Sequence, residues 1–339
     1  MFLPLYIYPV YSSQTVNNGV VGYYKEYLFE NAITWTTDGA NAGTVSYREG
    51  KFFSTNVNGV LISHKGLGNL AIALALNKVS YKHVSTAGIP KLMNNVMAEI
   101  DFNYPPELAE QQKISNFFKD VDNKITSLQN ALSKTKELKR SLVYKLLVVK
   151  NGIQPELRFP EFISPWIESK TEDIFDSFKR GVIDTIDDLS KEPTDDLKYP
   201  VYSAQVANNG ICGYTNTYTH EDCITWVTVG QKSGLVFFRE GKFNANDLCG
   251  IVTSHRGCSN RAMAEILNRV AYRYKNSSDI PQVNMATFKQ IIIKHPEDVL
   301  EQEKLSNVFK DVDNLIFAYE RVLEQQKTLK QAILQRMFI

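Results

Sequence analysis

The chain has 339 residues, and its 38 Lys and Arg nearly balance its 37 Asp and Glu. This length is enough for two domains with separate cores, and the even charge excludes a globally basic nucleic-acid binder, so basic groups would have to be placed locally. The four cysteines show no C-x-x-C spacing and no apolar run nears the roughly 20 residues that span a bilayer, so we expect a reduced, cytoplasmic protein without a metal site.

Short runs of β-branched and aromatic residues between glycine-rich turns predict that the first part of the chain is mostly β. We expect strands over 20–24, 32–36, 44–47 and 60–63. Apolar residues take helical spacing over 68–78, and a further strand is expected over 97–102. Pro105 then precedes a long helix, as proline does near a helix start.

The long helix that follows carries a heptad seam. Apolar residues recur every three or four positions at Ile114, Phe118, Val121, Ile125, Leu128 and Leu132. Thr135 and Lys139 interrupt the seam, while Leu138 lies off register. Such an interruption is either a stutter or a polar layer that sets the register. A seam of this length predicts a partner helix along it.

Most of the chain is written twice at a constant offset. Trp35 corresponds to Trp226 (35 + 191 = 226) and Val148 to Ile339 (148 + 191 = 339), with no gap between them. The second long helix repeats the seam at Leu305, Phe309, Val312, Ile316, Tyr319 and Leu323. Both copies should fold alike around an approximate two-fold axis, with the two helices paired as an antiparallel coiled coil. The alternative is that each helix covers its own domain as an amphipathic surface helix.

The repeat predicts an α+β fold with four parts. We expect a first β-rich globular domain at 1–105, a first long helix at 106–150, a second globular domain at 151–296 and a second long helix at 297–339. Residues 149–191, called the lead segment below, have no counterpart in the first half. The first globular domain is therefore expected to be incomplete at its N-terminus.

Comparison of the two copies reveals no catalytic motif. The sequence contains no G-x-x-x-x-G-K-[ST], H-E-x-x-H, G-x-S-x-G or strand-linked G-x-G-x-x-G pattern. His64 and His255 are the histidines that both copies share, and neither has a base or nucleophile at a common spacing. A phosphate contact and a locally bonded turn histidine are both open interpretations. We expect a protein that is not an enzyme.

Polar residues on strand ends and turns indicate DNA recognition instead. Both copies carry Tyr-Ser-x-Gln, Arg-Glu-Gly-Lys-Phe and Ser-His-(Lys/Arg)-Gly, and the loops between these shared motifs differ. Ser, Gln, Arg and Lys in such places contact phosphates and base edges, and a common frame with unlike loops suits two readers of two sequences. The alternative is that the aromatic residues form the core and the polar ones are ordinary turn formers. The candidate DNA-binding residues are Ser12, Ser13, Gln14, Thr37, Asp38, Asn41, Arg48, Lys51, His64, Lys65, Ser203, Gln205, Thr228, Gln231, Lys232, Arg239, Lys242, His255 and Arg256.

Three features together resemble the specificity subunits of type I restriction–modification systems. They are the tandem plan of domain and long helix, the Glu-Gln-x-Lys-(Ile/Leu)-Ser that opens each helix, and the run from Glu156 to Phe162 that opens the second domain. The resemblance covers nearly the whole chain.

This resemblance implies a non-catalytic subunit with two target-recognition domains, each reading half of a split sequence in double-stranded DNA. It also implies that the antiparallel helices space these domains and dock two methyltransferase subunits, and that restriction (motor) subunits complete the complex. S-adenosylmethionine, ATP and Mg would then belong to the partners, with no cofactor in this chain. The rival interpretation is a coiled-coil scaffold without DNA specificity, which would not need two divergent loop sets.

Overall fold

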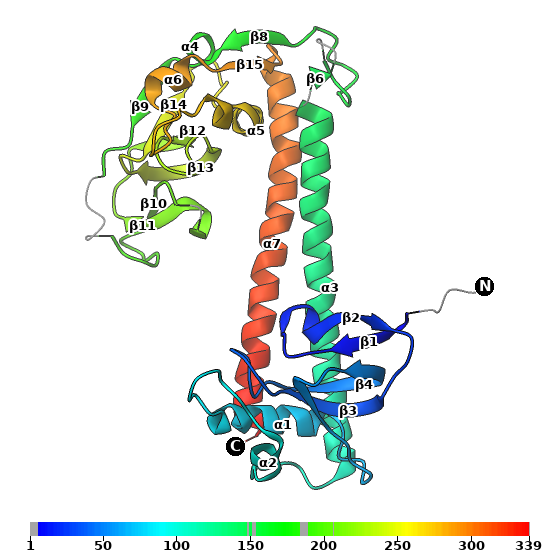
Figure 1. Ribbon diagram of the computed structural model, residues 1–339. Coiled ribbons are helices and arrows are strands. Elements are labelled where there is room, and N and C mark those ends of the chain that lie inside the picture. The colour runs from blue at the N-terminus through cyan, green and yellow to red at the C-terminus, as the bar shows by residue number, and fades with distance from the viewer. Residues whose placement is uncertain (1–5, 148, 151–153, 184–188, 206, 339) are drawn as a thin grey trace, which may run out of the picture. The chain divides into compact units, whose positions relative to one another are not determined.

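The computed structural model of the chain describes residues 6–147, 149–150, 154–183, 189–205 and 207–338 (Figure 1). The chain divides into two units, one formed by 1–131 with 319–339 and the other by 132–318. Each unit joins one β-rich module to one half of each long helix. Module 1 is the described part of 6–107, and module 2 is the described part of 154–298. None of the described helices is long and apolar enough to cross a membrane.

Module 1 is a five-stranded sheet with a helix packed against it. The elements are β1 (Tyr8–Tyr11), β2 (Val20–Tyr24), β3 (Phe29–Thr36), β4 (Val45–Ser54), β5 (Asn58–Leu61), α1 (Leu70–Ser80) and α2 (Asn94–Ala98). The strand order is β2-β1-β4-β3-β5, and every pair is antiparallel except β1 with β4. Asn69 caps α1 by accepting from Ile72 N at 3.1 Å. The core lies between this helix and the sheet, where the Trp35 indole donates to Leu92 O at 3.1 Å.

Module 2 repeats this plan and adds strands from the lead segment. Its elements are β7 (Gln154–Pro155, paired with β6, Val149–Lys150), β8 (Ile167–Lys170), α4 (Thr171–Ile174), β9 (Ser177–Arg180), β10 (Tyr199–Tyr202), β11 (Ile211–Thr215), β12 (His220–Val227), β13 (Val236–Ala245), β14 (Cys249–Thr253), α5 (Arg261–Val270), α6 (Met285–Lys289) and β15 (Ile292–His295). The main sheet has the order β11-β10-β13-β12-β14-β9, and β15 pairs separately with β8. The two modules therefore share a frame, and β8 and β9 belong to module 2.

The expected strand over 97–102 is wrong for module 1. Helix α2 ends at Ala98, and residues 99–107 form no strand. The equivalent segment of module 2 does form a strand, β15, because β8 of the lead segment pairs with it from Ile292 to His295. A strand needs a hydrogen-bonding neighbour, and no described segment of module 1 supplies one.

The two long helices, α3 (Leu108–Leu147) and α7 (Val299–Met337), pack together in antiparallel fashion (Figure 1). In the first unit Lys330 of α7 forms an ion pair with Asp122 of α3. In the second unit Lys139 of α3 and Asp313 of α7 lie 2.8 Å apart. The early half of each helix thus meets the late half of the other, which confirms the predicted α+β fold with paired helices.

The polar interruption of the seam is a layer within it. Thr135 is buried and Lys139 is half-buried, so both continue the seam. Leu138, which lies off register, and its counterpart Leu329 in the second copy (138 + 191 = 329) are 49% and 52% exposed. A stutter would have turned these leucines inward, so the polar layer is the interpretation that fits.

The ends of the seam serve the modules as well as the helix pair. Ile114 and Phe118 are buried with Ala71 and Ala75 of α1 and with Phe338. Their counterparts Leu305 and Phe309 belong to the main core of module 2. The remaining predicted seam residues are buried or half-buried along the helices.

Candidate nucleic-acid interface

A buried arginine in module 1 fixes the turn between β1 and β2. Arg48 donates to Asn18 O at 2.7 Å and to Thr34 Oγ1 at 3.0 Å, and its guanidinium lies 3.9 Å from the centre of the Tyr11 ring. Asn17 and Asn18 both have positive φ, a conformation that asparagine adopts more readily than most residues. Burial lowers the pKa of Arg48. Its internal hydrogen bonds and the Tyr11 ring stabilise the buried guanidinium.

Arg239 performs the same task in module 2. It donates to Asn209 O at 2.8 Å and to Thr225 Oγ1 at 3.2 Å, and it stacks on Tyr202 at 3.8 Å. We expected Arg48 and Arg239 to contact DNA. Both are more than nine-tenths buried and hydrogen-bonded inside their modules, so they are positioning residues that hold the turns.

Three turns of module 1 meet at one place. Thr55 in the β4–β5 turn donates to Ser12 Oγ at 3.1 Å, which ties that turn to the β1–β2 connection. Thr37 N donates to Val57 O at 3.3 Å, which ties the same turn to the β3–β4 connection. The surface formed by 12–19, 37–43 and 55–57 is called turn edge 1.

Module 2 builds an equivalent surface with different residues. Asn246 Nδ2 donates to Ser203 Oγ at 2.8 Å, and Thr228 Oγ1 donates to Leu248 O at 2.9 Å. The surface formed by 203–205, 207–210, 228–234 and 246–248 is called turn edge 2. Sequence reasoning missed the β4–β5 and β13–β14 turns, although the change from Thr55-Asn56-Val57 to Asn246-Asp247-Leu248 between the copies was a signal.

The predicted polar residues of the turn edges differ in their exposure. Gln14, Asn41, Gln205, Gln231 and Lys232 are exposed, Ser12, Ser13 and Asp38 are half-buried, and Thr37, Ser203 and Thr228 are buried. Asp38 accepts from Thr37 Oγ1 at 2.8 Å and forms an ion pair with Lys91 at 3.4 Å. The side-chain amides of Gln14 and Gln205 donate to Val20 O and Ile211 O within their modules. Asn41, Gln231 and Lys232 are therefore the exposed residues best placed to present hydrogen-bonding atoms outward.

The remaining predicted residues lie outside the turn edges. Lys51 and Lys242 are exposed on β4 and β13, each 4.5 Å from the centre of a tyrosine ring, Tyr27 and Tyr218 respectively.

His64 and Lys65 occupy an exposed turn after β5, next to the start of α3. In module 2 the backbone N–H of His255 donates to the Asp176 carboxylate, and the Arg256 guanidinium donates to Asp173 O at 2.8 Å. These two residues therefore tie their turn to the lead segment.

Turn edge 2 borders a cavity that sequence reasoning did not predict. This cavity has a volume of about 320 Å³. Lys179 and Arg180 of β9 line it together with Thr228, Gln282 and Asn284. Arg180 also forms an ion pair with Asp247 of the β13–β14 turn at 3.6 Å. The adjacent basic pair before Gly181 was the available signal in the sequence.

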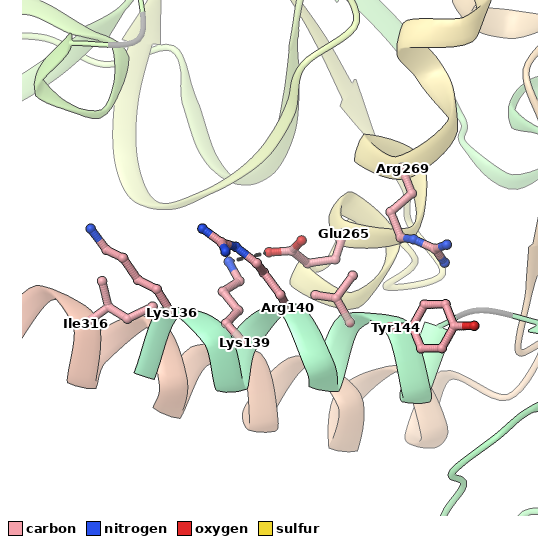
Figure 2. Close-up of a pocket in the computed structure, with 8 residues that line it drawn as sticks. Lys136, Lys139, Arg140, Tyr144, Glu265, Arg269 and Ile316 are labelled. Carbon is pink, nitrogen blue, oxygen red and sulfur yellow. Dashed lines mark ion pairs between the residues drawn. The ribbon is translucent and has the colours of Figure 1, made fainter. Parts of the chain in front are cut away.

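A second groove, with a volume of about 480 Å³, lies between α3 and α5 in the second unit. Lys136, Lys139, Arg140 and Tyr144 of α3 face Glu265 and Arg269 of α5 across it (Figure 2). Lys139 forms an ion pair with Glu265 at 2.7 Å. Burial alone would lower the pKa of Lys139, but Glu265 and Asp313 together raise it. Lys139 therefore links module 2 to the helix pair.

The motif that opens each long helix attaches that helix to its module. In the first unit Gln111 accepts from Asn69 at 2.7 Å and donates to Pro105 O at 2.7 Å, while Ser115 Oγ accepts from Ala71 N at 3.1 Å. Gln302 and Ser306 make the same bonds with Asn260, Pro296 and Ala262 in the second unit. The glutamine and serine hold the start of α1 or α5 against the long helix, which fixes each module on it.

The cysteines have structural environments. All four are free thiols, and burial raises the pKa of Cys223 and of Cys249 to about 12. Among the described residues no group of three or more His, Cys, Asp or Glu side chains is arranged to hold a metal ion. Such buried, protonated thiols are poor nucleophiles and poor metal ligands.

Comparison with known proteins defines the family. The model of the type I restriction modification DNA specificity domain matches residues 4–139 and 163–330. The chain belongs to this family of specificity subunits, the non-catalytic DNA-recognition components of type I restriction enzymes.

Individual relatives agree with this assignment. A type I specificity subunit of Mycoplasma pneumoniae, S.MpnORF507P, is 28% identical over 339 residues, which covers 98% of this chain and 89% of that protein. The specificity subunit of the type I restriction enzyme MpnII from the same organism is 36% identical over 152 residues, 44% of this chain and 46% of that protein. The crystal structure of a type I S subunit from M. genitalium has the same fold, with a TM-score of 0.74 at 15% identity over 99% of this chain and 90% of that one.

Proposed function

We propose that the chain reads a bipartite DNA target, with turn edge 1 contacting one half and turn edge 2 the other. The observation that carries this proposal is the grouping of the divergent turns. Equivalent arginines, Arg48 and Arg239, hold the Asn-Asn-Gly turn that both copies share, while the exposed side chains on the neighbouring β3–β4 and β12–β13 connections differ between the copies. A constant frame with changed contacts gives two different base preferences from one architecture.

The exposed groups of the turn edges suit direct contact with bases. Side-chain amides pair with adenine, and Lys and Arg pair with guanine or with phosphates. Turn edge 1 offers Asn41, and turn edge 2 offers Gln231 and Lys232. Asn41 and Lys232 occupy the same place in the repeat (41 + 191 = 232), so a single position carries an amide in one module and an ammonium in the other.

The residues outside the turn edges are assigned to the DNA backbone in this proposal. Lys51, His64 and Lys65, with Lys242 in module 2, are exposed polar or cationic groups without a divergent loop around them. Such groups position a protein on phosphates without reading sequence.

The helix pair is assigned two tasks, spacing and docking. The 40 residues of α3 extend about 60 Å at roughly 1.5 Å per residue, longer than the roughly 34 Å of one duplex turn. Phe117 and Phe317 are 43% and 66% exposed on the long helices, and exposed aromatic side chains of this kind mark protein interfaces. We assign these helices to two methyltransferase subunits, with restriction subunits joining through the complex. S-adenosylmethionine, ATP and Mg belong to those partners.

The test uses one matched pair of variants. Asn41→Ala and Lys232→Ala would each be assembled with the methyltransferase subunits of the same system, and the methylated sequences would be determined. Each variant is expected to relax only its own half of the target, because the two positions are equivalent in separate modules. Lys191→Ala, an exposed lysine of module 2 outside turn edge 2, is the control that should change neither half. Identical effects of all three variants would contradict the proposal.

A further inference from the structure

A buried ion pair anchors the lead segment to the first turn of α7. Arg158 donates through Nε and Nη2 to the two carboxylate oxygens of Glu301 at 2.7 and 2.8 Å. The Trp166 indole donates to Glu301 Oε1 at 3.1 Å. Glu301 is only 1% exposed, and it lies in the first turn of α7. A bidentate, charge-assisted contact of this kind fixes orientation as well as position.

The same segment then completes the sheet of module 2. Strand β9 adds to the edge of β14 in antiparallel register, from Ser177 opposite Thr253 to Arg180 opposite Gly250. It covers the edge so that Ile251 and Val252 are at most 1% exposed. The lead segment therefore docks through two contacts. Its arginine binds a glutamate of the long helix, and its strand pairs with the edge strand of the sheet.

The first unit carries both receiving features, one at the start of α3 and one on module 1. Glu110 is the counterpart of Glu301 (110 + 191 = 301), and it is exposed. Strand β5 is the counterpart of β14 and pairs only with β3 among the described residues. Next to these features, Ile62, Tyr104 and Leu108 are 61%, 43% and 53% exposed, whereas His295, the counterpart of Tyr104, is 4% exposed.

We propose that module 1 and the start of α3 form a docking site for a second lead-type segment, an extended peptide with the chemistry of residues 156–181. Its arginine would bind Glu110 and its strand would add to β5. The occupied site in module 2 defines this chemistry, because the same positions of the same frame receive that segment there. Unpaired strand edges accept such segments through backbone hydrogen bonds, and an exposed glutamate selects for a cationic side chain. The proposal concerns peptide binding and does not depend on the proposed DNA function.

A direct test measures binding of a labelled synthetic peptide of residues 156–181 to the intact chain by fluorescence anisotropy. Saturable binding is expected. Glu110→Gln in the chain, or Arg158→Gln in the peptide, should weaken it by about tenfold or more, since either change removes the charge-assisted pair. Glu137→Gln, an exposed glutamate elsewhere on α3, should bind as the unaltered chain does. Both chain variants change exposed side chains and should leave folding intact.

Hydrogen exchange locates the bound peptide. The backbone amides of 58–61 should become protected when the peptide is added, while those of β14 should not change. Binding that survives Glu110→Gln, protection that falls on β14, or no saturable binding would each overturn the proposal. Self-association through β5 without added peptide would assign the site to a second copy and would overturn it too. None of these results bears on DNA binding, which is measured separately.

Discussion

Lys139 pairs with Asp313, and the repeat places an equivalent pair, Lys330 with Asp122, in the other unit. The same offset relates both partners, since 139 + 191 = 330 and 122 + 191 = 313. The polar layer of the seam is therefore present twice, and each lysine forms an ion pair with an aspartate on the other helix. A shift of one helix along the other would break both pairs, so the layer sets the register.

Replacing these lysines should have unequal effects. Lys139 contacts Glu265 and Asp313, whose side chains are 17% and 29% exposed, whereas Lys330 contacts only one acid in these ion pairs, Asp122, whose side chain is 46% exposed. We expect Lys139→Met to lower the free energy of unfolding by about 1–3 kcal/mol, because it leaves two half-buried carboxylates less well paired. Lys330→Met should cost no more than about 1 kcal/mol. Urea unfolding of both variants checks this, and a larger loss for Lys330→Met would refute it.

Arg239→Lys should destabilise module 2 and lower the sequence specificity of its DNA recognition. A lysine cannot reproduce both the bond to Asn209 O and the bond to the buried Thr225 Oγ1, so at least one of these acceptors loses its donor. We expect a loss of about 2–4 kcal/mol in urea unfolding and relaxed preference in the second half-site only. Arg48→Lys is the matched variant for the first half-site. If the sequence preference in the second half-site is unchanged in Arg239→Lys, the arginine does not position the turn.

The stability of module 2 should fall in mild acid. Burial lowers the pKa of His295 below its ordinary 6.5. The unfolded chain therefore binds this proton more readily than the folded one, and the contribution of neutral His295 is present above about pH 6.5 and is lost as the pH falls through the lowered pKa. His295→Gln should flatten the dependence of unfolding free energy on pH between about pH 8 and about pH 5. An unchanged slope in that variant would assign the acid sensitivity to other groups.

The length of the helix pair should set the spacer between half-sites. One heptad inserted after Asn130 and another at the equivalent place after Arg321 preserves the seam and lengthens it by about 10 Å. We expect the preferred spacer to grow by about three base pairs at roughly 3.4 Å each, with both half-sites unchanged. Methylation of a panel of targets with different spacers measures this. An unchanged preference for the original spacer would mean that the length of the helices does not set the length of the spacer.

Local sequence signals predicted well the elements that both modules share. They failed where the formation of a strand depends on pairing with a segment that is distant in the sequence. Strand β2 was predicted at its observed bounds because Asn18-Gly19 marks the turn before it. The strand over 97–102 was wrong because its equivalent exists only through pairing with β8.

The burial of charged residues could not be predicted from the sequence either. Arg48 in a polar motif gave no sign of being 6% exposed and stacked on Tyr11, since that contact joins residues 37 positions apart (48 − 11 = 37). Lys179 and Arg180 line the cavity beside turn edge 2 only because β9 joins β14, and no periodicity within β9 reveals this pairing.

Exchange of one whole module tests the central claim most directly. A chain in which residues 8–104 are replaced by residues 199–295 would carry turn edge 2 in both positions on the same helix pair. Its methylated target, determined by sequencing after assembly with the methyltransferase subunits, should contain the second half-site twice as an inverted repeat, the arrangement expected if a two-fold axis relates the two copies of the repeat as the sequence predicts. Retention of the original first half-site would contradict the account, and so would two copies of the second half-site in direct repeat.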